Sequence, residues 1–121
     1  MKEAPVFVSG STQGSLGGPN AGSDDVWVAR YDGAGNEIWL RQFGTAVAEF
    51  SKGAAPDGGG RVYLGGGTGG SPYDVLALHY DAAGNLTWSV EFGSPANEIA
   101  RAAAPDGSGG VYLSGETGGI L

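Results

Sequence analysis

Apolar residues alternate along short segments of this chain with the two-residue period of β-strands. In the segment 26–31 the even-numbered side chains point to one side and the odd-numbered ones to the other, and both sets are largely apolar. A sheet that is apolar on both faces has to be covered on both, which predicts sheets stacked between neighbouring sheets. No segment of useful length carries apolar residues at helical spacing. The pattern therefore predicts an all-β fold.

Glycine, aspartate and asparagine separate the predicted strands. The segments YDGAGNEIW and YDAAGNLTW place such residues between two apolar runs, where Gly35 and Gly84 are expected to take the positive φ of a hairpin loop. Four aspartates recur in the turns: Asp32, Asp81, Asp57 and Asp106. An aspartate that recurs in a turn is better explained by hydrogen bonds to backbone N–H groups than by acid-base catalysis.

The chain contains an internal repeat. Residues 25–70, the first repeat, align without gaps onto residues 74–119, the second repeat, and 24 of the 46 aligned positions are identical. A shorter match places VFVSGST, from Val6, on VYLGGGT, from Val62. The match needs seven additional residues in the Gly/Ser/Asn-rich segment 11–24, which is predicted to be a loop because loops absorb length changes at little cost. The repeat predicts nine strands, grouped as three, four and two.

The complete group of four strands is predicted at residues 49–55, 61–66, 73–80 and 85–92. Seven positions per repeat carry a resemblance to a known family: Tyr31, Asp32, Gly35, Asn36, Trp39, Phe43 and Gly44, with Tyr80, Asp81, Gly84, Asn85, Trp88, Phe92 and Gly93. They resemble the D-x-x-V-A-x-Y-D-x-x-G-N-x-x-W-x-x-x-F-G pattern, followed by a D-G-x-V-Y-V-x-G hairpin, of the bacterial seven-bladed β-propeller type repeats. The resemblance implies a propeller, usually inside large bacterial surface or secreted proteins. It implies no common activity or catalytic residue.

We therefore expect tandem four-stranded antiparallel propeller-like blades in one segment, 1–121, with a partial blade at about 5–43, a full blade at about 48–92 and a partial blade at about 97–117. Closed propellers have about four to eight blades, so one chain is too short to close a ring. We expect either a homo-oligomer closed through blade-to-blade packing or a fragment of a longer propeller. Three chains would supply about six blades and four chains about eight.

Composition narrows the classes of function. The chain has 13 acidic and 6 basic side chains and a net charge of -7, which disfavours a nucleic-acid partner. Cysteine is absent, so disulfides and thiolate metal sites are excluded. The sequence shows no signal peptide and no membrane span, and the family resemblance alone points to a secreted or cell-surface protein. We expect no cofactor.

Five residues are candidates for a ligand site or an interface: Trp27, Arg30, His79, Glu49 and Glu98. His79 is the only histidine, and Arg30 takes its position in the first repeat, so we expect a structural or surface residue. Its pKa near neutrality would matter mainly if it lay at an interface between copies. Trp27 replaces Leu76, and it is either a binding aromatic or a core residue at the centre of a strand.

Two recurrent residue types remain. Glu49 and Glu98 occupy matching positions, and we expect charged residues at the mouth of a central channel, where a ring of carboxylates could bind a cation weakly. Trp39 and Trp88 recur at the repeat spacing, which favours packing between blades. No catalytic or metal-binding residue is assigned.

The functional hypothesis is a non-enzymatic structural or interaction module that self-assembles and presents variable loops, notably residues 11–24. A first alternative is a binding module for carbohydrate or a cell-surface polymer, with sites in grooves between blades. A second is a scaffold fragment of a propeller hydrolase with acids around a central channel, although a fold alone does not license that inference. The glycan or protein ligand is not specified by the sequence.

Overall fold

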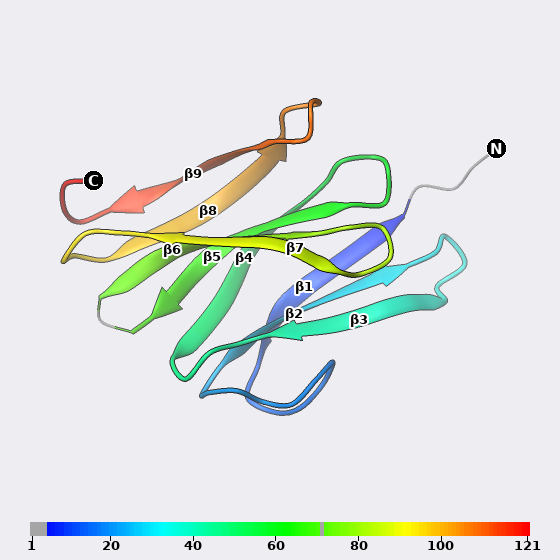
Figure 1. The fold of residues 1–121 in the computed structure, drawn as a ribbon, viewed down its shortest axis with the longest axis horizontal. Coiled ribbons are helices and arrows are strands. Elements are labelled where there is room, and N and C mark those ends of the chain that lie inside the picture. The colour runs from blue at the N-terminus through cyan, green and yellow to red at the C-terminus, as the bar shows by residue number, and fades with distance from the viewer. Residues whose placement is uncertain (1–4, 71) are drawn as a thin grey trace.

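The computed structural model describes residues 5–70 and 72–121 (Figure 1). The described residues form nine β-strands: β1 (Val6–Thr12), β2 (Asp25–Tyr31), β3 (Glu37–Phe43), β4 (Ala48–Pro56), β5 (Val62–Gly69), β6 (Tyr73–Tyr80), β7 (Leu86–Phe92), β8 (Glu98–Pro105) and β9 (Val111–Thr117). They include no helix, which confirms the predicted all-β class. Within the same residues, no helix is long and apolar enough to cross a membrane.

The strands form three antiparallel sheets in which each strand pairs with its neighbour in sequence. We call β1-β2-β3 the first sheet, β4-β5-β6-β7 the central sheet and β8-β9 the last sheet. The predicted division into three, four and two strands is thus confirmed for the described residues. The observed bounds of the four central strands differ from the predicted ones by at most three residues.

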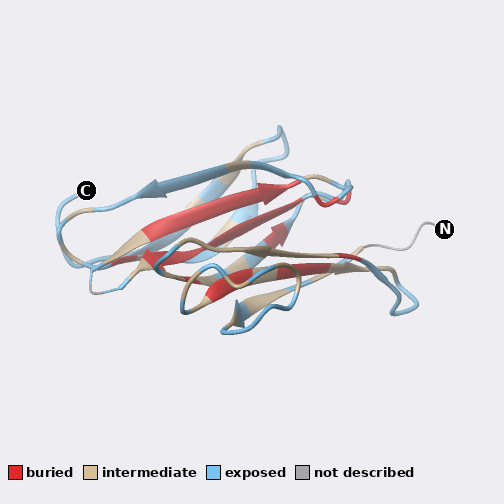
Figure 2. Ribbon diagram, turned by 60° about the horizontal axis from the view of Figure 1, so that its bottom comes forward, coloured by how far each residue is buried: buried red, intermediate tan, exposed pale blue. Residues whose placement is uncertain are grey.

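The first and last sheets lie on opposite sides of the central sheet (Figure 1). Strands β1 and β2 pack against β4, whereas β8 packs against β4, β5 and β6. Nearly every residue of β5 and β6 is buried, while β7 and β9 are mostly exposed (Figure 2). The prediction of a sheet covered on both faces is therefore confirmed for the inner strands of the central sheet, and the first and last sheets are each covered on one face.

The main apolar core lies between the first and central sheets. Its buried members alternate along their strands: Val26, Val28 and Trp39 in the first sheet, and Val62, Leu64, Leu76, Leu78 and Tyr80 in the central sheet. The Trp39 ring stacks on Tyr80 with a centroid separation of 5.9 Å, and it contacts Phe7 at 6.0 Å. Burying a large apolar side chain stabilises a fold by roughly 1.5–3 kcal/mol, so this sheet-on-sheet contact holds the two sheets together.

The recurrent aspartates close the hairpin loops, as predicted. Asp32 accepts hydrogen bonds from two backbone N–H groups of its own loop, and Asp81 does the same in the second repeat. The other two recurrent aspartates also accept two such bonds each. Gly35 and Gly84 have φ values of 86° and 87°, which residues with a side chain rarely adopt. The turn chemistry inferred from the sequence is therefore confirmed.

A buried aspartate explains the glycine that follows each recurrent phenylalanine. Asp25 begins β2, is fully buried, and accepts a hydrogen bond from Gln42 Nε2 at 2.9 Å. Its carboxylate lies against Gly44, where an added Cβ would come within 2.0 Å of Asp25 Oδ1. Asp74 and Gly93 repeat this arrangement with a separation of 2.1 Å. Glycine is needed here because the carboxylate occupies the space of a side chain.

We expect Gly44→Ala to lower the free energy of unfolding by about 1–3 kcal/mol, because the new methyl group overlaps the buried Asp25 carboxylate. The matched control is Gly70→Ala, where an added Cβ meets nothing within 4 Å. Urea unfolding at one fixed protein concentration measures both. Equal stabilities of the two variants would contradict the close approach described here.

Candidate functional site

Glu49 is a buried carboxylate near the start of β4. It accepts hydrogen bonds from the backbone N–H of Thr45 at 2.6 Å, from Thr45 Oγ1 at 2.7 Å and from Thr68 Oγ1 at 2.9 Å. Thr45 lies in the loop before β4, and Thr68 lies opposite Glu49 on β5. The side chain therefore ties the entry loop of the central sheet to its second strand.

Glu98 repeats this arrangement at the start of β8. Its carboxylate accepts bonds from the backbone N–H and the hydroxyl of Ser94, at 2.5 and 2.8 Å, and from Thr117 Oγ1 at 2.7 Å. The N–H of Ser94, followed by the Thr117 hydroxyl, lowers the pKa of Glu98 below its usual 4.5. We expected Glu49 and Glu98 at the mouth of an open channel, and this placement is wrong: both carboxylates are buried and bonded within the chain.

His79 belongs to an aromatic cluster on the face of the central sheet that is turned toward the last sheet. Its ring lies 4.5 Å from the ring of Tyr63 and 5.7 Å from that of Trp88, centroid to centroid. Its Nδ1 forms a hydrogen bond with the hydroxyl of Thr87. Burial lowers the pKa of His79 below its usual 6.5, so the ring is neutral at pH 7.

Arg30, at the equivalent position of the first repeat, links two sheets. Its Nη1 donates a hydrogen bond to the carbonyl oxygen of Ala82, in the loop between β6 and β7, at 2.7 Å. Trp39 Nε1 donates to the same carbonyl at 3.0 Å. The guanidinium also lies against Gly60. Arg30 therefore fastens the first sheet onto loops of the central sheet.

Trp27 lies on the outer face of the first sheet, away from the central sheet. Its indole lies over Gly10 of β1, where an added Cβ would come within 3.1 Å of the ring. The side chain is partly exposed, whereas its counterpart Leu76 is only 2 % exposed because the first sheet covers it. Trp27 is thus a large aromatic side chain on a face that no other described strand covers.

The five candidates do not gather into one site. Trp27 and Arg30 lie on opposite faces of β2, His79 lies on the central sheet, and the two glutamates lie near the starts of β4 and β8. In residues 5–70 and 72–121, no group of three or more histidine, aspartate and glutamate side chains could hold a metal ion. The arrangement offers aromatic packing surfaces and internally bonded carboxylates.

Sequence reasoning missed an incompletely covered surface beside the last sheet. Trp88 and Phe92 repeat Trp39 and Phe43, and we expected the two tryptophans to be packed in the same way. Trp39 is 5 % exposed, but Trp88 is only partly buried and Phe92 is 45 % exposed. The signal was available in the strand count. The hairpin β6–β7 covers Trp39, and because the last sheet has two strands, the described residues contain no equivalent hairpin that could cover Trp88.

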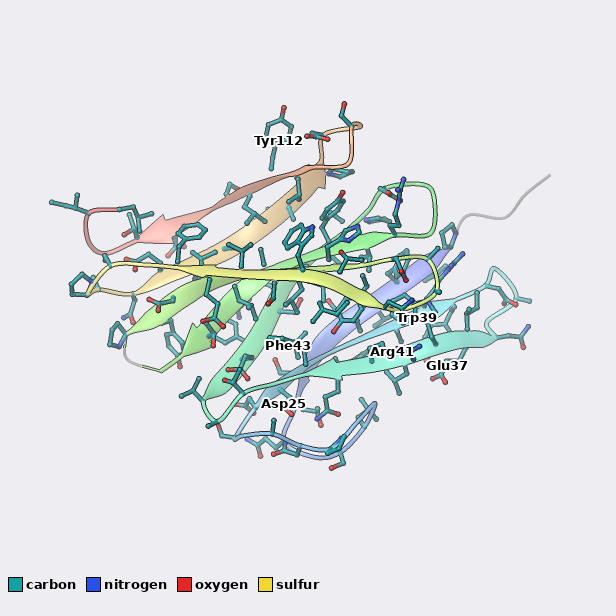
Figure 3. The ribbon with its side chains drawn as sticks, viewed as in Figure 1. Asp25, Glu37, Trp39, Arg41, Phe43 and Tyr112 are labelled. Carbon is teal, nitrogen blue, oxygen red and sulfur yellow. The ribbon has the colours of Figure 1, made fainter. Side chains whose placement is uncertain are left out.

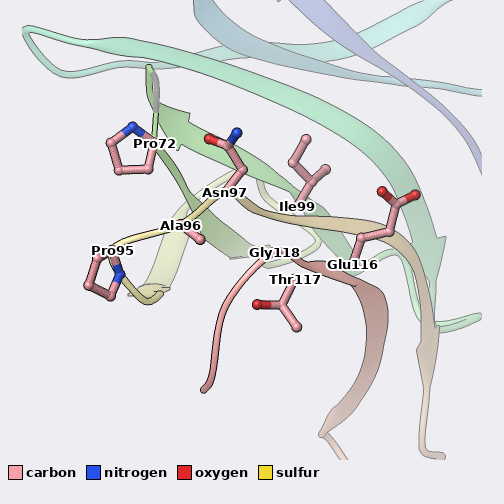
Figure 4. A pocket seen from close by; sticks show the side chains of 8 residues that line it. All are labelled: Pro72, Pro95, Ala96, Asn97, Ile99, Glu116, Thr117 and Gly118. Atoms are coloured by element: carbon pink, nitrogen blue, oxygen red, sulfur yellow. The ribbon is translucent and has the colours of Figure 1, made fainter.

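A depression of about 570 Å³ lies at the end of the last sheet (Figure 4). Ile99 lines it at the position where the first repeat has Phe50, whose ring packs edge-on against Tyr73 at 5.2 Å. No counterpart of Tyr73 faces Ile99 among the described residues. The depression is therefore a packing position that is filled in the first repeat and open in the second.

No protein-family model matches the chain, and a comparison with curated proteins finds no matching sequence. The resemblance to bacterial propeller repeats therefore stays a prediction that rests on the fourteen repeated positions themselves.

We expect Glu49→Gln to lower the free energy of unfolding by about 1–3 kcal/mol, because the amide group leaves at least one buried donor of the carboxylate without an acceptor. Glu37→Gln, at an exposed position of β3, is the control and should change stability by less than about 0.5 kcal/mol. Urea unfolding of both variants is the measurement. Indistinguishable midpoints would show that the buried hydrogen bonds of Glu49 contribute nothing.

The stability advantage of the wild type over Glu98→Gln should depend on pH. Because the folded-state pKa of Glu98 is below 4.5, the carboxylate stabilises the fold above that pH, and this contribution is lost as the pH falls through the folded-state pKa. Urea unfolding of both proteins from about pH 6 to about pH 3 should show their difference shrinking below pH 4.5. A difference that stays constant would contradict the lowered pKa.

Proposed function

We propose that this chain is a non-enzymatic structural and interaction module whose molecules associate by stacking their sheets. One observation carries the proposal. The residues with which the first sheet packs on the central sheet recur one repeat later, on the face of the central sheet beside the last sheet. There, no hairpin loop in the described residues covers them. An exposed apolar and aromatic surface of this kind marks an association site.

Trp39 shows what a covered position looks like (Figure 3). Its ring stacks on Tyr80, its Nε1 donates to the carbonyl of Ala82, and Gly84 lies so close that an added Cβ would come within 2.8 Å of the indole. Trp88 occupies the equivalent position in the second repeat, where its ring lies beside His79 and Tyr63 of its own sheet. Among the described residues, no hairpin loop of another sheet covers it with a tyrosine, a carbonyl group and a glycine. Its Nε1 therefore lacks the carbonyl partner that the loop between β6 and β7 gives to Trp39.

The matching surface belongs to the first sheet of the same chain. Tyr31, Gly33 and Gly35 stand one repeat before the three residues that contact Trp39. Gly35 has the same backbone conformation as its counterpart, and an added Cβ there meets nothing within 4 Å. The loop between β2 and β3 of one molecule can thus cover Trp88 of another, as the loop between β6 and β7 covers Trp39.

Such a contact is head-to-tail because two different surfaces meet, and it repeats until a ring closes. Together with the resemblance to propeller repeats, this supports a ring of four-stranded blades, about six from three molecules or about eight from four. Closure removes the exposed terminal faces, which would otherwise invite uncontrolled aggregation.

The connection between β1 and β2, residues 13–24, is the segment that we propose the assembly presents. Gln42 holds it in place: its Oε1 accepts hydrogen bonds from the N–H groups of Leu16 and Gly17, at 2.8 and 3.0 Å, and its Nε2 donates to the carbonyl of Gly14 at 2.9 Å. The corresponding connection between β5 and β6 is much shorter. The segment is therefore an ordered, exposed addition that is suited to contact a protein or glycan ligand.

We expect Trp88→Ala to weaken self-association by about 2 kcal/mol, roughly thirtyfold in dissociation constant, because a buried aromatic anchor dominates such an interface. Leu16→Ala is the control, since Leu16 is 53 % exposed and lies outside both proposed surfaces. Sedimentation equilibrium measures association, and far-ultraviolet circular dichroism verifies that each variant stays folded. A folded Trp88→Ala protein that associates like the wild type would contradict the proposal.

A further inference from the structure

Strands β1 and β9 occupy the same position in two incomplete sheets. Strand β1 pairs with β2 in the register in which β5 pairs with β6: Gly10 faces Trp27 as Gly66 faces Leu76. Strand β9 pairs with β8 in the register in which β5 pairs with β4. Among the described residues, the first sheet therefore has no counterpart of β4 and the last sheet has no counterparts of β6 and β7. Strand β1 in the first sheet and strand β9 in the last sheet each take the position of β5.

A cavity marks the place of the missing strands. Between the central and last sheets lies a space of about 170 Å³. Six of the residues that line it are Val75, Ile99, Ala100, Leu113, Ser114 and Gly115. Their counterparts one repeat earlier are Val26, Phe50, Ser51, Leu64, Gly65 and Gly66, which surround a site with no room for a water molecule. Leu76 and Leu78 of β6 complete that filled site, and no described residue of the last sheet takes their place.

Strand β2 carries the residues that correspond to this missing pair. One repeat before Leu76 and Leu78 stand Trp27 and Ala29, on the outer face of the first sheet. We infer that the first sheet of one molecule joins the last sheet of another, so that β1 pairs with β8, β9 is released, and Trp27 enters the cavity. This inference rests on the proposed self-association and specifies its strand pairing.

In the inferred assembly β1, and not β9, occupies the position of β5 beside β8. The reason is that β1 is held on two sides in its own molecule. It pairs with β2 and packs against β4, where Ser9 Oγ lies 3.1 Å from Ser51 Oγ. Within its own sheet, Phe7 of β1 also contacts Trp39 of β3. Strand β9 pairs with β8, and its Leu113 lies against Gly65 of β5, but in the described part of the chain it packs along no strand outside its own sheet as β1 packs along β4. Tyr112, at the position of Phe7, is 69 % exposed and points away from the rest of the molecule (Figure 3). Releasing β9 thus breaks fewer contacts than releasing β1.

The exchange also preserves the hydrogen bonds of the buried Glu98. In the last sheet the Thr117 hydroxyl donates to this carboxylate, as Thr68 donates to Glu49 in the central sheet. In the register of β5 beside β4, Thr12 of the incoming β1 lies opposite Glu98. A threonine hydroxyl is therefore supplied to Glu98 in either state.

The absence of cysteine in the chain allows this pairing to be tested by cross-linking full-length molecules. In the inferred register Val8 faces Ala103 of the other molecule, as Leu64 faces Ala54 in the central sheet. Val8→Cys and Ala103→Cys proteins are mixed, incubated so that molecules can associate, oxidised and run on a non-reducing gel. Each protein carries one cysteine, so any disulfide-linked pair is intermolecular.

A second mixture, Ala29→Cys with Leu113→Cys, reports the opposite arrangement, in which β9 pairs with β2 and β1 is released. Each single variant oxidised alone is the background control, and light scattering gives the mass of every unoxidised mixture.

We expect the first mixture to give a band at twice the chain mass, at least tenfold above the single-variant controls, and the second mixture to stay at background. An assembled protein that cross-links only in the second mixture, or in neither, overturns the strand pairing and leaves the proposed self-association standing. A mixture that stays monomeric by light scattering overturns both. An open strand edge is a ready template for pairing with another chain, and β8 presents such an edge once β9 leaves it.

Discussion

The structure depends on the packing of β-sheets that are apolar on both faces. The central sheet illustrates the constraint: the side chains of β5 and β6 are buried because the first sheet covers one face and the last sheet covers the other. Removing apolar area from water contributes roughly 25 cal/mol per Å², and an uncovered face loses that contribution. Each incomplete sheet at the two ends of the stack therefore has an uncovered face that lacks this contribution.

Buried polar groups fix the geometry of this packing. A carboxylate inside a fold is tolerated only when hydrogen-bond donors surround it, and Glu49 and Glu98 each have three within the chain. The same sets of donors recur one repeat apart, so both entry loops take the same path. In the proposed assembly this regularity matters, because equal geometry at each repeat is what lets the first sheet of one molecule fit beside the central sheet of another.

Local chemistry and repetition were enough to predict much of the fold. The two-residue period and the repeat predicted the strands and their grouping. The turns were predictable because the aspartates and glycines of the hairpins shape backbone that lies only a few residues away in sequence. The burial of Glu49 could not be predicted, because its donor Thr68 comes from a neighbouring strand and its position depends on register. The exposure of Trp88 was missed for a related reason: identical residues at equivalent positions differ when one of them lacks a neighbouring sheet.

The central claim, that the incomplete end sheets are completed by other molecules, is tested most directly by the mass of the wild-type protein in solution. Light scattering coupled to size exclusion, over a wide range of protein concentration, measures it without a label. We expect one discrete multiple of 12.1 kDa that persists on dilution, as a closed ring requires. A folded monomer of 12.1 kDa at every concentration would show that the end sheets need no partner, and it would contradict the account.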